Sequence, residues 1–217
     1  MKNDLEVRRT RIWDIPIRIW HWLFAISLTT SWVTGYFTEL YATTVHAISG
    51  FAVFSLLIYR LLWGLCGGDY VRWTHYWTTP IQFVKHFSRG AKEKAHTAPG
   101  IILVILLMLA ALVQSSTGLF TTDDIFFEGP LTQYVEEDFS NLARWIHHQN
   151  WWIIVTLVSI HLLAHLIYLV VLRDKLPLSM FHGMKKISGK DTQDYPIRAL
   201  LCGIVAIAVF SFLYNLF

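Results

Sequence analysis

Charged side chains are scarce in this sequence: they make up 15% of its 217 residues, whereas a soluble domain carries roughly a quarter. The few charges largely avoid five long apolar stretches, none of which contains Asp or Glu. A bilayer core about 30 Å thick is crossed by about 20 helical residues, and each stretch is long enough. We therefore predict one all-α integral membrane domain over residues 1–217, with helices at about residues 17–38, 44–67, 97–121, 145–173 and 197–217.

Basic residues gather on one side of these predicted helices. All but one of the 18 Lys and Arg residues lie in or next to the segments before the first helix, between the second and third, and between the fourth and fifth. The other side carries an acidic loop before the fourth helix, where Arg144 is the exception. The positive-inside rule then predicts a multi-pass protein of the bacterial inner membrane, with a cytoplasmic N-terminus and a periplasmic C-terminus.

Cysteine is almost absent. Cys66 and Cys202 both fall near helix ends on the basic side, where thiols stay reduced, so no disulfide is expected. The lack of a C-x-x-C-H stretch excludes a covalently attached c-type haem. A cleavable signal peptide is excluded as well, because the first apolar stretch is too long, contains His21 and has no small-residue cleavage site.

Histidine, in contrast, is present where it is least expected, and an imidazole in a membrane helix is by default a functional residue. His147 and His161 lie fourteen residues apart in the fourth predicted helix. They point within about 40° of each other and differ by about 21 Å in height. His165 points the same way, so angle alone leaves it open as an alternative to His161. His148 points away from this face.

Two further histidines lie at matching heights in other helices. His46 starts the second helix and is level with His147, while His21 lies near the basic end of the first helix and is the natural partner of His161. Two such pairs, one near each membrane surface, are typical of the axial ligands of two b-type haems. Zinc fits worse, because it needs three or four ligands at one height.

Glycines and arginines next to these histidines complete the predicted sites. Gly35 lies at the height of the outer pair, and Gly50 lies one turn after the second-helix histidine; either glycine lets a porphyrin approach the backbone. Arg60 is aimed at the inner pair, and Arg18 lies one turn before the first-helix histidine. Both arginines are predicted to bind haem propionates.

The remaining histidines have simpler explanations. His148 is expected at the outer interface, and His165 is expected to donate to a neighbouring helix or to a propionate. Four others belong to basic segments and are expected to be solvated: His75, His86, His96 and His182. Among these, His96 lies close enough to the membrane to reach a quinone head group.

Several motifs resemble those of the bacterial cytochrome b561 family, which includes the cytochrome b subunits of nickel-iron hydrogenases. They are Trp13-Asp14-x-Pro16-x-Arg18-x-x-His21-Trp22, His46-x-x-x-Gly50, Arg60-x-x-Trp63, and Thr117-Gly118-Leu119-Phe120 followed by Asp123-Asp124 and Gly129-Pro130. The likeness covers about residues 12–186. One departure is the segment 96–99, His-Thr-Ala-Pro, where relatives more often have Gly-His-Asn-Pro.

The resemblance implies a four-helix haem-binding transmembrane bundle, in which the fourth helix ligates both haems. It implies that His21 pairs with His161 and His46 with His147, which favours His161 over His165. The fifth helix carries no histidine and is expected to be a peripheral transmembrane helix.

The expected function is that of a dihaem membrane cytochrome which moves electrons between a quinone pool and a periplasmic or complex-bound redox partner. Whether it is a quinone oxidoreductase or the electron-relay anchor of a hydrogenase-like complex is left open. A transporter that uses histidine is a weaker alternative, because no Asp or Glu lies within a span. Candidate partners are the lipid bilayer, a quinone, a periplasmic redox protein or cytochrome c, and a second copy of the chain; no nucleic acid is expected.

Overall fold

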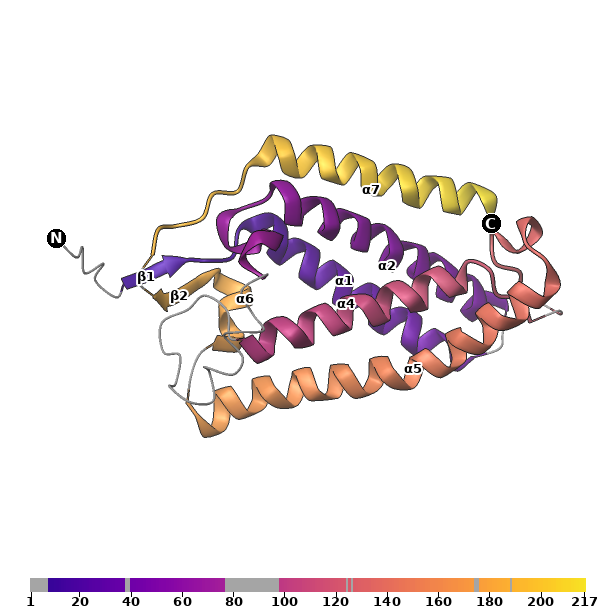
Figure 1. Cartoon of the computed structure of the whole chain (residues 1–217), viewed down its shortest axis with the longest axis horizontal. Coiled ribbons are helices and arrows are strands. Elements are labelled where there is room, and N and C mark those ends of the chain that lie inside the picture. Colours follow the sequence, from indigo (N-terminus) through magenta and orange to yellow (C-terminus); the bar gives the residue numbers. More distant parts are fainter. Residues whose placement is uncertain are drawn as a thin grey trace.

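The computed structural model describes residues 8–37, 40–76, 98–123, 125, 127–173, 176–187 and 189–217. Its main feature is a bundle of long helices, α1 (Ile15–Thr34), α2 (Leu40–Cys66), α4 (Ala98–Gly118), α5 (Glu137–Leu166) and α7 (Pro196–Leu216). Helix α2 packs against α1, α4 and α7, and α4 packs against α5. Helix α7 lies on the outside of the bundle, along α2 (Figure 1).

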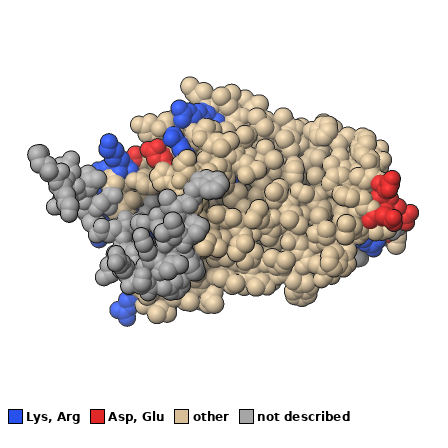
Figure 2. Space-filling view, in the orientation of Figure 1, with Lys and Arg blue, Asp and Glu red and all other residues tan. Residues whose placement is uncertain are grey.

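The described part of the chain contains four helices that are long and apolar enough to cross a membrane: Ala42–Cys66, Pro99–Gly118, Glu137–Val171 and Pro196–Leu216. Helix α1 has 20 residues, but Arg18, His21 and its tryptophans lower its hydropathy. Charged side chains lie at the two ends of the bundle, and its visible middle is free of them (Figure 2). The chain is thus a mostly helical, multi-pass membrane protein, as predicted.

Helix α1 begins where Asp14 ties it to the end of α2. The carboxylate of Asp14 accepts hydrogen bonds from Ile17 N at 2.8 Å, from Trp63 Nε1 and from Gly68 N. The first bond caps the helix, and Pro16 in the first turn needs no backbone partner. Asp14 is fully buried, and this burial raises the pKa of its carboxyl group. The Trp-Asp-x-Pro motif therefore anchors two helices to each other.

Helix α5 starts earlier than the expected boundary near residue 145. It begins at Glu137, with Glu137 and Asp138 in its first turn. Acidic side chains stabilise a helix N-terminus through the helix dipole, so part of the predicted acidic loop is helical. At the other end, the helix continues as a π-helix over Ile167–Val171. His147 and His161 therefore lie on a helix that is longer than the sequence suggested and whose N-terminus is stabilised by acidic side chains.

A small sheet, which was not predicted, closes the basic end of the bundle. Strand β1 (Arg8–Arg11) pairs antiparallel with β2 (Met184–Ile187), although nearly the whole chain separates them. The short helix α6 (Ser179–His182) leads into β2, and sheet and α6 lie at the end opposite the C-terminus (Figure 1). Arg11 stabilises this region through an ion pair with Asp194 at 3.0 Å.

Candidate functional site

His46 of α2 and His147 of α5 face each other near the acidic end of the bundle. Their ring centroids are 6.2 Å apart, and the ring planes are inclined by 78°. The two residues are therefore level, even though they come from helices for which no extensive direct packing is found. We refer to His46 and His147 as the outer pair.

Each ring of the outer pair is held by a backbone carbonyl of a neighbouring helix. His46 Nδ1 donates to Ser31 O of α1 at 2.8 Å, and His147 Nδ1 donates to Gln114 O of α4 at 2.9 Å. A proton fixed on Nδ1 leaves Nε2 with a free lone pair, which is the state in which imidazole binds a metal. Within the described residues, neither Nε2 atom has a hydrogen-bond partner.

A glycine lies against each of these rings. A Cβ atom added to Gly35 would lie 3.2 Å from Cε1 and Nδ1 of His46, and one added to Gly118 would lie 3.0 Å from Cε1 of His147. Both distances are at or below the lower limit of ordinary contacts, so a larger residue would push the imidazole. Gly35 was predicted at this height, whereas Gly118 was noticed only as part of a motif.

Gly50 differs from these two glycines. A Cβ atom added there would meet nothing within 4 Å. The residue therefore borders open space one turn away from His46, on the same helix. The approach of a porphyrin to the backbone of α2 at Gly50 stays a prediction.

Sequence reasoning missed a polar contact that joins α4 and α5 beside His147. Asn150 Nδ2 donates to Ala110 O and to Gln114 Oε1, each at 2.8 Å. The backbone carbonyl of the same Gln114 accepts the hydrogen bond from His147. An amide side chain within an apolar span is a signal that could have revealed both residues.

The histidines near the basic end are arranged differently. His161 and His165 of α5 lie with their Nε2 atoms 3.2 Å apart and their ring centroids 4.4 Å apart. His21 of α1 has a buried Nδ1 atom without a hydrogen-bond partner in the described part of the chain, as does His165. Among the described residues, His21 makes no ring contact with either α5 histidine, and its ring contact is with Trp22.

Arg60 is a buried cation in an aromatic cage. Its side chain is 3% exposed, and its guanidinium lies 4.3 Å from the ring centroid of Trp73. Nη2 donates to the hydroxyl of Tyr76 at 3.2 Å, whereas Nη1 is buried and has no partner within the described segments. Burial raises the pKa of Tyr76, which keeps this hydroxyl protonated. No carboxylate of the described segments forms an ion pair with Arg60.

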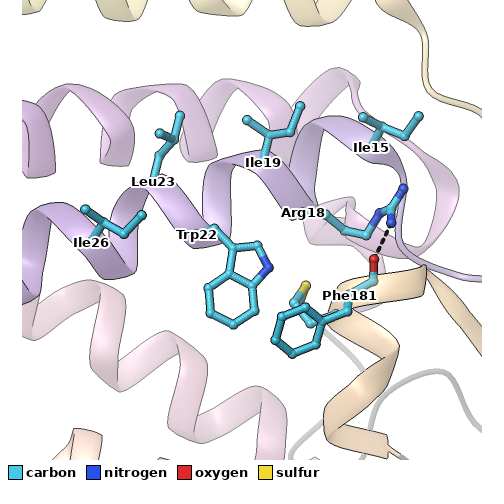
Figure 3. Close-up of a pocket in the computed structure, with 8 residues that line it drawn as sticks. Ile15, Arg18, Ile19, Trp22, Leu23, Ile26 and Phe181 are labelled. Carbon is cyan, nitrogen blue, oxygen red and sulfur yellow. Dashed lines mark hydrogen bonds between the residues drawn. The ribbon is translucent and has the colours of Figure 1, made fainter.

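Arg18 lies at the side of α1, where Nη1 donates to Phe181 O of α6 at 2.7 Å. Its Nε atom is buried beside Gly183 and has no hydrogen-bond partner among the described residues. Figure 3 shows this arginine at the edge of an apolar groove. Its orientation towards α6 gives less support to a role as a propionate ligand than the burial of Arg60 does.

The other histidines vary in their surroundings. His148 is exposed, as expected, and its ring centroid lies 6.2 Å from that of His147. His75 contacts the ring of Tyr70, and His182 accepts a hydrogen bond from Met184 N. His86 and His96 lie outside the described residues.

Apolar helices that bring imidazoles together inside a membrane are typical of membrane-bound helical cytochromes. In the outer pair, the Nδ1 hydrogen bonds leave Nε2 in the state that binds a metal. Residues 12–183 match the sequence model of prokaryotic cytochrome b561, and the chain belongs to this family. It is therefore a b-type cytochrome that transfers electrons in a membrane, with b-type haem as its cofactor. Helix α7 lies beyond the matched residues.

Two relatives extend this comparison. The chain is 22% identical to a probable Ni/Fe-hydrogenase B-type cytochrome subunit of Rhizobium leguminosarum bv. viciae, over 89% of this chain and 95% of that protein. It is 23% identical to the protein of the same description from Rhodobacter capsulatus, over 84% of this chain and 85% of that one. No solved structure matches the chain significantly.

Proposed function

We propose that the chain binds two b-type haems and passes electrons between a quinone and a redox partner. His46 and His147 are the axial ligands of the outer haem, and His21 and His161 are those of the inner haem. The geometry of the outer pair is the observation that carries this proposal.

The outer pair fits the axial positions of one iron. With metal–imidazole bonds of about 2 Å, two rings on opposite sides of one ion have centroids about 6 Å apart, and the observed separation is 6.2 Å. The Nδ1 bonds to Ser31 and Gln114 leave both Nε2 atoms available. The open space beside Gly50 supports the approach of a porphyrin.

The inner site is supported by its unsatisfied polar atoms. Nδ1 of His21 and Nη1 of Arg60 are both buried and have no partner among the residues that the structure describes, and burial without a partner is costly unless a bound group supplies one. A propionate would satisfy the guanidinium of Arg60 and compensate its buried charge. Arg18 was also predicted for this role, but its guanidinium is turned towards Phe181 O of α6, so we assign the propionate to Arg60.

When bound, haem supplies a one-electron carrier whose potential depends on its ligands and surroundings. The residues of this chain orient the haem and adjust its reduction potential. The carbonyls of Ser31 and Gln114 fix the imidazoles and increase their basicity, while Gly35 and Gly118 keep room for them. The buried positive charge of Arg60 would favour the reduced state of a bound haem, because this state carries one more electron than the oxidised state.

The charge distribution supports the proposed topology. Glu136, Glu137 and Asp138 lie at the start of α5 and are exposed. Figure 2 shows a group of acidic side chains at one end of the molecule and most of the visible basic side chains at the other. We infer that α1 is a fifth span, that the N-terminus is cytoplasmic and the C-terminus periplasmic, and that the membrane is the inner membrane. A redox protein with a basic surface, such as a cytochrome c, would be attracted to the acidic end.

A more specific candidate is the cytochrome subunit of a hydrogenase-like complex. The descriptions of both relatives support it, because each is named as a probable hydrogenase cytochrome subunit. In this case the redox partner is a membrane-associated enzyme. Co-purification from the native membrane separates this candidate from a cytochrome that acts alone.

Quinol-driven reduction of the purified holoprotein tests the function. Addition of a quinol under anaerobic conditions is expected to produce the absorption bands of reduced b-type haem. Dithionite serves as the control that reduces all haem. Reduction by dithionite without any reduction by quinols of several potentials would contradict the quinone part of the proposal.

A further inference from the structure

An apolar groove of about 450 Å³ runs along the surface of α1 near the basic end (Figure 3). Aliphatic side chains from Ile15 to Ile26 form one wall, and Trp22 with Phe181 of α6 contributes the other. The rings of Trp22 and Phe181 are in contact, with centroids 4.6 Å apart. Ile19 is 56% exposed and Ile26 is 61% exposed, so the groove opens towards the surrounding membrane.

The length of this groove corresponds to one leaflet. The eleven residue steps from Ile15 to Ile26 span about 16 Å along a helix. Half of a bilayer core about 30 Å thick is about 15 Å. An acyl chain of a lipid in the leaflet at the basic end therefore matches the groove along its whole length.

Arg18 is the charged residue that lines the groove, and it lies near the end where a lipid head group would be. The bond from Nη1 to Phe181 O holds the guanidinium in place. Nε is packed beside Gly183 and is not accessible from the groove, and no carboxylate in the described residues forms an ion pair with Arg18. A lipid phosphate would compensate the charge of this guanidinium.

More positive charge lies at this end of the molecule. In the sheet, Arg9 of β1 is paired in register with Lys186 of β2. Like charges directly opposite each other on two strands destabilise the pairing. Anionic head groups near the sheet would compensate this repulsion.

We infer that the groove is a binding site for one anionic phospholipid, with an acyl chain along α1 and the phosphate at Arg18. This inference goes beyond electron transfer and does not depend on the number of haems. The groove favours a phospholipid over a quinone, because it combines a cation at the head-group level with an apolar length that fits one leaflet.

Native mass spectrometry of the holoprotein tests this site. The protein is released from nanodiscs made of equal parts of phosphatidylglycerol and phosphatidylcholine. One phosphatidylglycerol per chain is expected to remain bound to the wild type. Arg18→Gln is expected to weaken this retention about ten-fold or more, as for the loss of a charged hydrogen bond. Ile19→Trp, which fills the groove but keeps Arg18, is expected to weaken it as well.

Two matched variants control for net charge and for bulk. Arg144→Gln removes one positive charge at the opposite end, and Ile160→Trp enlarges an exposed residue of α5 that is outside the groove. Both are expected to retain the lipid, and the haem absorbance of every variant reports its folding. Equal retention in Ile19→Trp and Ile160→Trp, retention of phosphatidylcholine in place of phosphatidylglycerol, or a quinone at this position would overturn the inference.

Discussion

His46 and His147 are held by carbonyls of two other helices, whereas His161 is turned towards His165 on its own helix. The Nδ1 bonds of the outer pair fix the tautomers, and neither Nε2 atom has a hydrogen-bond partner among the described residues. At the inner site, the closest imidazole contact is the 3.2 Å approach of the two α5 histidines. A haem held by Nε2 of His161 would compete with this contact.

The comparison teaches that two sites with similar histidine spacing can differ in preorganisation. A ligand that binds a preformed site loses less free energy to ordering than one that must rearrange side chains. We therefore expect the outer haem to be bound more tightly than the inner haem. Each of the following substitutions would break or sharpen this difference.

The largest effect is expected from loss of an outer ligand. His147→Ala removes one of two axial imidazoles, and the holoprotein is expected to contain one haem per chain in place of two. His148→Ala is the matched control, because this neighbouring residue is exposed and should leave the haem content unchanged. Haem is counted by absorbance against protein concentration. Full haem content in His147→Ala would refute the assignment of this ligand.

The inner site is tested by exchanging its two candidate ligands separately. His161→Ala is expected to lose the inner haem, while His165→Ala is expected to keep it, since His161 is the proposed ligand and His165 is its neighbour at 3.2 Å. Haem content and the reduced-minus-oxidised spectrum distinguish the two variants. Equal retention in both would contradict the pairing of His21 with His161.

A smaller effect is expected from Gly118→Ala. The added Cβ would lie 3.0 Å from the imidazole of His147, and relieving such a contact costs about 1–3 kcal/mol. We expect a shift of the potential of the outer haem and weaker haem retention. Gly50→Ala places the same methyl group where no described protein atom lies within 4 Å, so an effect on the outer potential would come from the porphyrin. A redox titration of both variants distinguishes a contact with His147, which Gly118→Ala would create, from a contact with the porphyrin, which Gly50→Ala would create. An unchanged outer potential in Gly118→Ala would show that this glycine does not constrain His147.

The smallest change is expected when the support of α4 against α5 is removed. Asn150→Ala deletes the bonds to Ala110 O and Gln114 Oε1, and we expect a loss of about 1–2 kcal/mol in unfolding free energy. Thermal unfolding in detergent, followed by haem absorbance, measures it. The exposed neighbour Gln149 provides the control substitution Gln149→Ala. Equal melting temperatures for both variants would mean that Asn150 does not support the outer site.

The sequence allowed the fold class and family to be predicted, because apolar stretches and intramembrane histidines are local patterns. It also predicted that Gly35 lies beside the outer pair. The acceptors of the imidazole hydrogen bonds are backbone carbonyls, which any residue could provide, so no side-chain pattern identifies Ser31 or Gln114. The early start of α5 was not predicted, because acidic residues are common in loops, although they also favour a helix N-terminus.

Long-range pairing was the other feature beyond prediction. Strands β1 and β2 each have four residues, and nothing in either short basic segment indicates the other as its partner. The i, i+4 spacing of His161 and His165 places them on one face of α5, but it does not determine which of the two rings turns towards α1.

The haem content of the purified wild-type protein tests the central claim most directly. It is determined from the pyridine haemochrome spectrum and an independent measurement of protein concentration. We predict two b-type haems per chain, with one haem released more readily than the other on mild detergent treatment. One haem per chain at full saturation would contradict the two-site account. A protein that stays colourless after incubation with excess haem and removal of the unbound haem would refute the account altogether.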